Sequence, residues 1–86
     1  MLIERRNTGE IKDLEVVDTE PQSRKVVLRW PMYGYLEFCI DTGQGKGKAA
    51  SQWFLTKESK AQAKKLLKER LQKREESIGS GNTSGR

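Results

Sequence analysis

The feature that most constrains the fold is the change of hydrophobic period at Thr56. Before this residue, apolar and polar side chains alternate in short runs, as they do in the strands of a half-buried sheet. The hydroxyl of Thr56 can cap a helix that begins at Lys57, and Glu58 lies where the helix dipole favours a negative charge. The pattern therefore predicts one helix from residue 57 to about residue 76. Its narrow core-facing stripe consists of Ala63, Leu66, Leu67, Arg70 and Leu71.

Chain length and composition limit how large the core can be. A chain of 86 residues, of which 34% are apolar and 34% charged, predicts one small domain with a thin core. We therefore expect an α+β fold, with a three- or four-stranded antiparallel sheet and one long C-terminal helix packed on one face. Residues 1–10 are interpreted as a lead-in, residues 11–76 as the sheet-plus-helix domain, and residues 77–86 as a disordered Gly/Ser-rich tail.

The strongest strand prediction is a hairpin formed by residues 24–30 and 35–41. Both segments alternate with a period of two, and residues 31–34 form a plausible four-residue turn between them. Cys39 falls on the face away from the core and is interpreted as an inert strand residue, because the chain has no histidine to activate it. The side chains expected to face the core are Val26, Leu28, Trp30, Leu36, Phe38 and Ile40.

Two further strands are expected, one on each side of this hairpin. Residues 11–18 form the first, which precedes a break around Pro21, and residues 49–55 form the second. Between the hairpin and the last strand, residues 42–48 contain three glycines and two lysines, which predicts a flexible loop or a splayed hairpin tip. This run lacks the spacing of a phosphate-binding P-loop. A mobile basic loop that reaches phosphates and a plain connecting loop both remain open.

The distribution of charge suggests an anionic partner. Residues 1–20 carry a net charge of −3, whereas residues 21–86 carry +8. Such asymmetry is typical of a positive face that meets phosphate. The plain alternative is that Lys and Glu only keep a small helix soluble.

Aromatic residues are interleaved with basic ones around the predicted hairpin. Aromatic faces can stack on bases while a basic groove follows the nucleic-acid backbone. In a core this thin, Trp30 and Trp53 are interpreted as structural, which leaves Tyr33 and Tyr35 as the candidates for stacking. The predicted nucleic-acid-binding residues are Arg29, Tyr33, Tyr35, Lys46, Lys48, Lys57 and Lys60.

Two stretches resemble known nucleic-acid-binding families. Residues 33–38, YGYLEF, resemble the second half of the RNP1 signature of RNA recognition motifs, in which strand aromatics stack on bases. Pro31 and Met32 depart from that signature, since they stand where a basic residue and a glycine belong.

A longer stretch, residues 35–72, resembles the arm-binding domain of tyrosine recombinases. The segments that carry the resemblance are YLEFCID, TGQGKGK, SQWFLT and KESKAQAKKLL. The resemblance implies a three-stranded sheet that lies in the DNA major groove, with strand side chains on base edges and loop lysines on phosphates. Ser59 and the glycines of residues 42–48 depart from the family pattern.

Catalysis finds no support in the sequence. The chain has no histidine, and no Cys or carboxylate cluster has metal-ligand spacing, so we expect no enzyme activity, cofactor, metal or small-molecule substrate. Neither a membrane span nor a secretory segment is apparent, so we expect a cytoplasmic or nucleoid-associated protein. The expected partner is nucleic acid, DNA in preference to RNA. The alternative is a protein-interaction adaptor or inhibitor that docks or self-associates through its acidic N-terminal region or its C-terminal helix.

Overall fold

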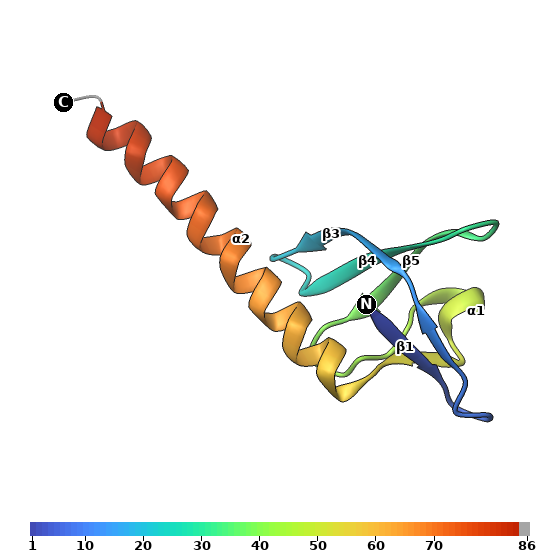
Figure 1. Ribbon diagram of the computed structural model, residues 1–86. Coiled ribbons are helices and arrows are strands. Elements are labelled where there is room, and N and C mark those ends of the chain that lie inside the picture. Colours follow the sequence, from blue (N-terminus) through green and yellow to red (C-terminus); the bar gives the residue numbers. More distant parts are fainter. Residues whose placement is uncertain (85–86) are drawn as a thin grey trace.

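A computed structural model describes the backbone of residues 1–84 and the side chains of residues 1–72. Six strands precede the long helix, and a short helix interrupts them before the last strand (Figure 1). The elements in chain order are β1 (Leu2–Arg5), β2 (Ile11–Asp13), β3 (Glu15–Glu20), β4 (Lys25–Trp30), β5 (Gly34–Cys39), α1 (Gly47–Ala50), β6 (Trp53–Leu55) and α2 (Lys57–Ser84).

The strands form two three-stranded antiparallel sheets, ordered β2-β1-β6 and β3-β4-β5. The predicted α+β class is confirmed, but the expected single sheet is replaced by two. Residues 11–20 run through both sheets, because β2 pairs with β1 and β3 pairs with β4. Leu14 lies between these two strands and is buried, so the segment turns from one sheet to the other around an apolar anchor.

The first strand belongs to the domain and is not a lead-in. β1 is the central strand of its sheet, and Ile3 is fully buried between its partners Lys12 and Leu55. Residues 1–10 had been expected to lead into the domain, because a strand of four residues is too short for its period to stand out. A turn follows β1, in which the Gly9 N–H donates to the carbonyl of Arg5 at 2.9 Å.

The hairpin of β4 and β5 has the predicted alternation. Val26 pairs with Phe38 and Leu28 pairs with Leu36, and all four side chains are buried. Ile40, just past the end of β5, is also fully buried. The apolar faces of the two sheets therefore enclose one core between them.

The glycine-rich run of residues 42–48 is part of the sheet structure instead of a free loop. Gln44 bridges to Phe54 of β6, and Gly45 bridges to Phe38 of β5. Because β5 and β6 belong to different sheets, this bridge joins the sheets on the side opposite residues 11–20, and the domain is barrel-like. The expected strand at residues 49–55 is correspondingly shorter, since α1 occupies its first part.

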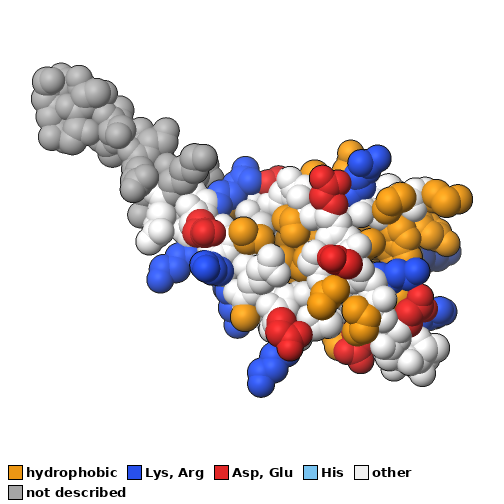
Figure 2. All heavy atoms as spheres, viewed as in Figure 1, with side chains coloured by type: hydrophobic (Ala, Val, Ile, Leu, Met, Phe, Trp, Pro, Cys, Tyr) orange, Lys and Arg blue, Asp and Glu red, His pale blue; other side chains and the backbone are white. Residues whose placement is uncertain are grey.

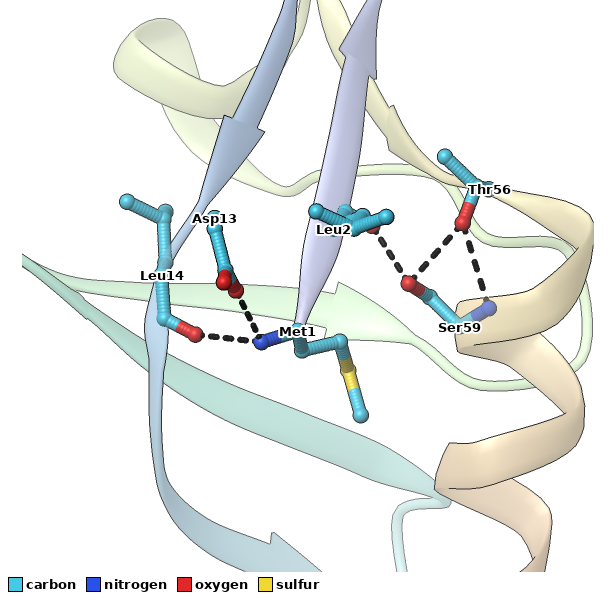
Figure 3. Close-up of polar contacts among 6 residues, drawn as sticks. All are labelled: Met1, Leu2, Asp13, Leu14, Thr56 and Ser59. Carbon is cyan, nitrogen blue, oxygen red and sulfur yellow. Dashed lines mark hydrogen bonds and ion pairs between the residues drawn. The ribbon is translucent and has the colours of Figure 1, made fainter.

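The start of α2 is tied to β1 by a small hydrogen-bond network (Figure 3). The hydroxyl of Thr56 accepts a hydrogen bond from the Ser59 N–H at 3.2 Å and donates one to Ser59 Oγ at 2.9 Å. The Ser59 hydroxyl then donates to the Leu2 carbonyl at 2.5 Å. The cap expected at Thr56 is confirmed, and Ser59 is a buried tie between the helix and the first strand.

Helix α2 packs against β3 of one sheet and against β1 and β6 of the other. Ala63 and Leu67 are buried against the core, and Arg70 donates a hydrogen bond to Asp18 of β3. The helix then points away from the sheets, with Leu71 39% exposed (Figure 1). It reaches Ser84, past the end expected near residue 76, and the tail predicted for residues 77–86 falls outside the part of the chain whose side chains are described.

Candidate nucleic-acid interface

The structure brings two of the predicted binding residues together on the outer face of the β3-β4-β5 sheet. Arg29 of β4 and Tyr35 of β5 are partners in the antiparallel register, and the Tyr35 side chain is 66% exposed. Arg29 is exposed as well. The two side chains are thus open to solvent, as the sequence suggested.

Acidic residues from β3 and β5 neutralise this sheet face. Glu15 lies opposite Arg29 in the register, and its carboxylate is 3.9 Å from the guanidinium. Lys25 is 3.2 Å from Glu37, and Glu20 is its register partner on the other side. The expected basic sheet surface is therefore a face of mixed charge. A period-two pattern shows which residues of a strand share a face, but it does not reveal which neighbouring strand supplies the opposing charges.

Tyr33 lies in a different place from Tyr35. It belongs to the turn between β4 and β5 and lines a pocket of about 290 Å³. The pocket is built from the β4–β5 turn, the β1–β2 hairpin, α1 and β6, and in Figure 1 the turn and α1 lie at the end of the domain away from the projecting part of α2. The residues that line it are Arg5, Glu10, Lys12, Trp30, Tyr33, Ala49 and Trp53.

Three aromatic rings meet in this pocket. The Trp30 ring packs edge-to-face against both Tyr33 and Trp53, with ring centroids 5.1 Å apart in each pair. Trp53 is 7% exposed and belongs to the core, while Trp30 is half-buried and Tyr33 is 68% exposed. The structural role expected for the tryptophans is present, and both rings also form walls of the pocket.

Arg5 and Lys12 are pocket residues that the sequence reasoning missed. The guanidinium of Arg5 lies over the Trp53 ring at 6.0 Å and donates to Gln52 Oε1 at 3.3 Å. Its Nε is buried and has no hydrogen-bond partner within the described part of the chain. Both basic residues lie in the acidic first twenty residues, so the net charge of that segment concealed them. Only the pairing of β1 with β6 brings Arg5 to Trp53.

The two lysines of the glycine-rich run lie in different places. The Lys46 N–H donates to the carbonyl of Glu37 at 2.9 Å, in the middle of β5 and away from the Trp30 end of the hairpin. Lys48 lies in α1, next to the pocket residue Ala49. Both lysine side chains are exposed, and Lys48 adds positive charge near the pocket without lining it.

The remaining predicted lysines belong to a basic stripe on α2, which we define as Lys57, Lys60, Lys64 and Lys68. At 3.6 residues per turn, these four side chains fall within about 80° of the helix circumference. Glu58 and Glu69 lie at least about 80° away from the stripe on the same helix. None of the ion pairs between described residues involves the stripe. Figure 2 shows basic side chains gathered around the part of α2 nearest the sheets.

The stripe passes the turn that follows β5. A Cβ added at Gly43 in that turn would lie 3.1 Å from Cδ of Lys60, so helix and turn are in close contact. Asp41 belongs to the same turn, and its carboxylate accepts two hydrogen bonds of 2.7 and 2.8 Å from Arg24, which directly precedes β4. The hydrogen bond from Arg24 lowers the pKa of the Asp41 carboxyl, and nearby Lys64 adds to this effect.

We expect Asp41→Asn to remove a pH-dependent part of the stability. Because the folded-state pKa of Asp41 lies below its ordinary value of 3.8, its contribution is present above that pH and is lost as pH falls through the folded-state pKa. Urea unfolding should therefore show a stability gap between wild type and Asp41→Asn that is constant above about pH 5 and narrows below about pH 4. Arg24→Gln should reproduce this profile. A gap that stays constant down to about pH 2 would contradict the assignment.

No helix among the described residues is long and apolar enough to cross a membrane. Within the same residues, no group of three or more His, Cys, Asp or Glu side chains is arranged to hold a metal ion. The chain matches no known family model, no curated protein and no solved structure. The resemblance to recombinase arm-binding domains is therefore untested, and the two strands that carry it, β5 and β6, lie in different sheets.

Proposed function

We propose that this chain is a small nucleic-acid-binding protein, accessory or regulatory and not enzymatic, with DNA as the first candidate ligand. The observation that carries the proposal is the basic stripe on α2. Its four lysines form no ion pair among the described side chains, although Lys64 lies near Asp41, and they line one side of a helix that extends beyond the sheets.

The length of the stripe suits contact with several phosphates. Lys57 and Lys68 are eleven residues apart, which is about 16 Å along a helix with a rise of 1.5 Å per residue. One strand of a duplex carries a phosphate about every 3.4 Å along the helix axis, so the stripe spans about five of them. Lysines act on phosphates as flexible point charges, so this contact requires no fixed bidentate geometry.

The proposal leaves out the outer face of the β3-β4-β5 sheet. Arg29 faces Glu15 there, and Lys25 is paired with Glu37. The positive charges of Arg29 and Lys25 are therefore largely balanced by carboxylates of the protein itself. Tyr35 has no unpaired cation beside it in the register. Lys46, beside the middle of β5, and Lys48, in α1, remain in the proposal as exposed cations.

Replacing all four stripe lysines by glutamine should weaken nucleic-acid binding and flatten its salt dependence. Each lost phosphate contact lowers the slope of log K against log salt by about 0.7 to 0.9, so the quadruple variant should lose about 3 units of slope. Fluorescence anisotropy with labelled single- and double-stranded oligonucleotides at several salt concentrations measures this. Glutamine keeps helix propensity close to that of lysine, and circular dichroism checks the fold.

Lys65 supplies a matched control for the stripe. It follows Lys64 directly and is about 100° away around the helix, outside the stripe. Lys64→Gln and Lys65→Gln have the same net charge, so a nonspecific electrostatic effect should weaken binding equally in both. The proposal expects the larger loss for Lys64→Gln. If the wild-type protein binds no oligonucleotide at low salt, the proposed function is wrong. If Lys64→Gln and Lys65→Gln lose equal affinity, the stripe is not the binding surface.

The second candidate function is a protein-interaction adaptor. Two observations favour it: Leu71 is 39% exposed where α2 leaves the sheets, and Ile11 is 48% exposed on the edge strand β2. An exposed edge strand can pair with another chain, and a projecting helix can pack against a partner helix. Sedimentation equilibrium distinguishes the candidates, since a stable dimer weakened by Leu71→Gln would favour the adaptor. A monomer that gains mass only with oligonucleotide would favour nucleic-acid binding.

A further inference from the structure

We propose that the pocket between the β1–β2 hairpin, the β4–β5 turn and α1 binds one unpaired nucleobase, together with its phosphate, from a single strand. This inference rests on the proposed nucleic-acid binding and names the form of ligand that the domain selects. Of the residues that line the pocket, Tyr33 is a predicted binding residue, whereas Arg5, Lys12, Trp30 and Trp53 are not.

Size and chemistry of the pocket fit a single planar group. Its volume of about 290 Å³ is just below the range of roughly 300–1,000 Å³ that is typical of sites for drug-sized ligands. The rings of Trp30 and Trp53 meet at 83°, and that of Tyr33 lies at 72° to Trp30, so the walls are aromatic faces set at right angles. A base that enters beside Tyr33 would find a ring face for stacking and ring edges around it. Figure 2 shows apolar side chains gathered at this end of the molecule.

The charge of the pocket wall calls for an anion from the ligand. Arg5 forms no ion pair with a described acidic side chain, whereas Lys12 is 3.4 Å from Glu10 and these two charges largely cancel. The Arg5 guanidinium is therefore the uncompensated charge of the pocket, and a phosphate group would neutralise it.

Charge selects a nucleotide over the other ligands that aromatic pockets take. A quaternary ammonium or methylated lysine would be repelled by Arg5, whose guanidinium already lies over Trp53. A proline-rich peptide would fit the rings but would leave the Arg5 guanidinium without an anionic partner. A strand of nucleic acid supplies the ring and the anion together, and the exposed Lys48 lies next to the pocket residue Ala49, where a neighbouring phosphate could reach it. A base paired in a duplex is stacked and cannot enter.

Intrinsic tryptophan fluorescence tests the pocket directly. The chain contains only two tryptophans, and both line the pocket, so their emission reports its occupancy and not electrostatic contact elsewhere. We expect a short thymidine oligonucleotide to quench or shift this emission, and an abasic oligonucleotide of equal length and charge to bind without the change. A blunt duplex of the same sequence should behave like the abasic strand.

Tyr33→Ala and Tyr35→Ala form the matched pair of variants. The two side chains are similarly exposed, at 68% and 66%, but only Tyr33 lines the pocket. We expect Tyr33→Ala to weaken binding of the thymidine strand about five- to tenfold, as expected for loss of one stacked base, with no change for the abasic strand. Tyr35→Ala should leave both affinities unchanged, and neither substitution removes a buried side chain.

The possible failures are distinguishable. The thymidine, abasic and duplex ligands could all bind with equal, salt-dependent affinity and leave the tryptophan emission unchanged. That result would leave the proposed function standing, but it would overturn the proposal that the pocket binds a base. Equal losses in both tyrosine variants would also overturn it, as would emission changes produced by a proline-rich peptide and not by the thymidine strand. If no oligonucleotide binds at low salt, the proposed function and the pocket fall together.

Discussion

Gly45→Ala should destabilise the domain by about 3 kcal/mol or more, at the upper end of what overpacking usually costs. An added Cβ at this position would lie 2.1 Å from the Ala50 carbonyl oxygen and 2.7 Å from its Cβ. Backbone cannot rotate away as a side chain can, so either α1 or the bridge between β5 and β6 must move. Urea unfolding followed by circular dichroism measures the loss. Because the bridge joins the two sheets, we also expect the variant to unfold less cooperatively.

Gly47→Ala is the matched control for this prediction. Gly47 has a positive φ of 82°, and the space that a Cβ would occupy is open. Alanine at this position would therefore strain the backbone without a steric clash. Left-handed backbone costs a non-glycine residue roughly 1–2 kcal/mol. The comparison separates backbone strain at Gly47 from steric conflict at Gly45. A smaller loss for Gly45→Ala than for Gly47→Ala would show that α1 does not lie against the bridge as described.

Phe38→Ala should cost about 3–5 kcal/mol, the usual range for a fully buried phenylalanine. Among the described residues, Phe38 is the largest side chain with no exposed surface. It lies on β5, where both the hairpin partner Val26 and the bridge residue Gly45 meet it. Small domains have only about 5–15 kcal/mol of total stability, so a large share of this variant should be unfolded at 37 °C. Thermal and urea unfolding check this expectation.

The other phenylalanine gives the control. Phe54 is half-buried and its ring lies under the Arg6 guanidinium at 5.5 Å, so Phe54→Ala should cost clearly less than Phe38→Ala. Phe38→Leu, which keeps most of the volume, should recover the greater part of the loss. Equal costs at both phenylalanines would mean that the space between the sheets is not the centre of the core.

The predictions that proved accurate concern local patterns. Alternation correctly indicated the core faces of β4 and β5, because Val26 and Phe38 each lie in a run long enough to show a period of two. Thr56 was recognisable as a cap because the interaction spans three residues, from its hydroxyl to the Ser59 N–H. The buried positions of Ala63 and Leu67 followed from helical spacing in the same way. For the candidate site, sequence reasoning found exposed cations and Tyr33, but not the surfaces to which they belong.

The predictions that failed concern contacts between distant segments. β1 was not predicted because a strand of four residues is too short to show an alternation of apolar and polar side chains. Its position in the sheet depends on pairing with β6, about fifty residues away. The glycine-rich run was expected to be a loop because glycine is flexible in isolation. At Gly45 the absence of a side chain instead allows close approach to Ala50. The neutral sheet face was unforeseen because the opposing carboxylate of Glu15 comes from another strand.

By itself, the sequence determined the class of fold, the helix start and the apolar faces of the central hairpin, since these follow from side-chain spacing within a few residues. The tertiary structure alone decided that there are two sheets, that residues 44–45 join them, and that Arg5 meets Trp53 in an aromatic pocket. The physical reason is that pairing between distant strands depends on which burial satisfies the whole core at once. A short stretch of sequence therefore does not show which distant strand it will pair with.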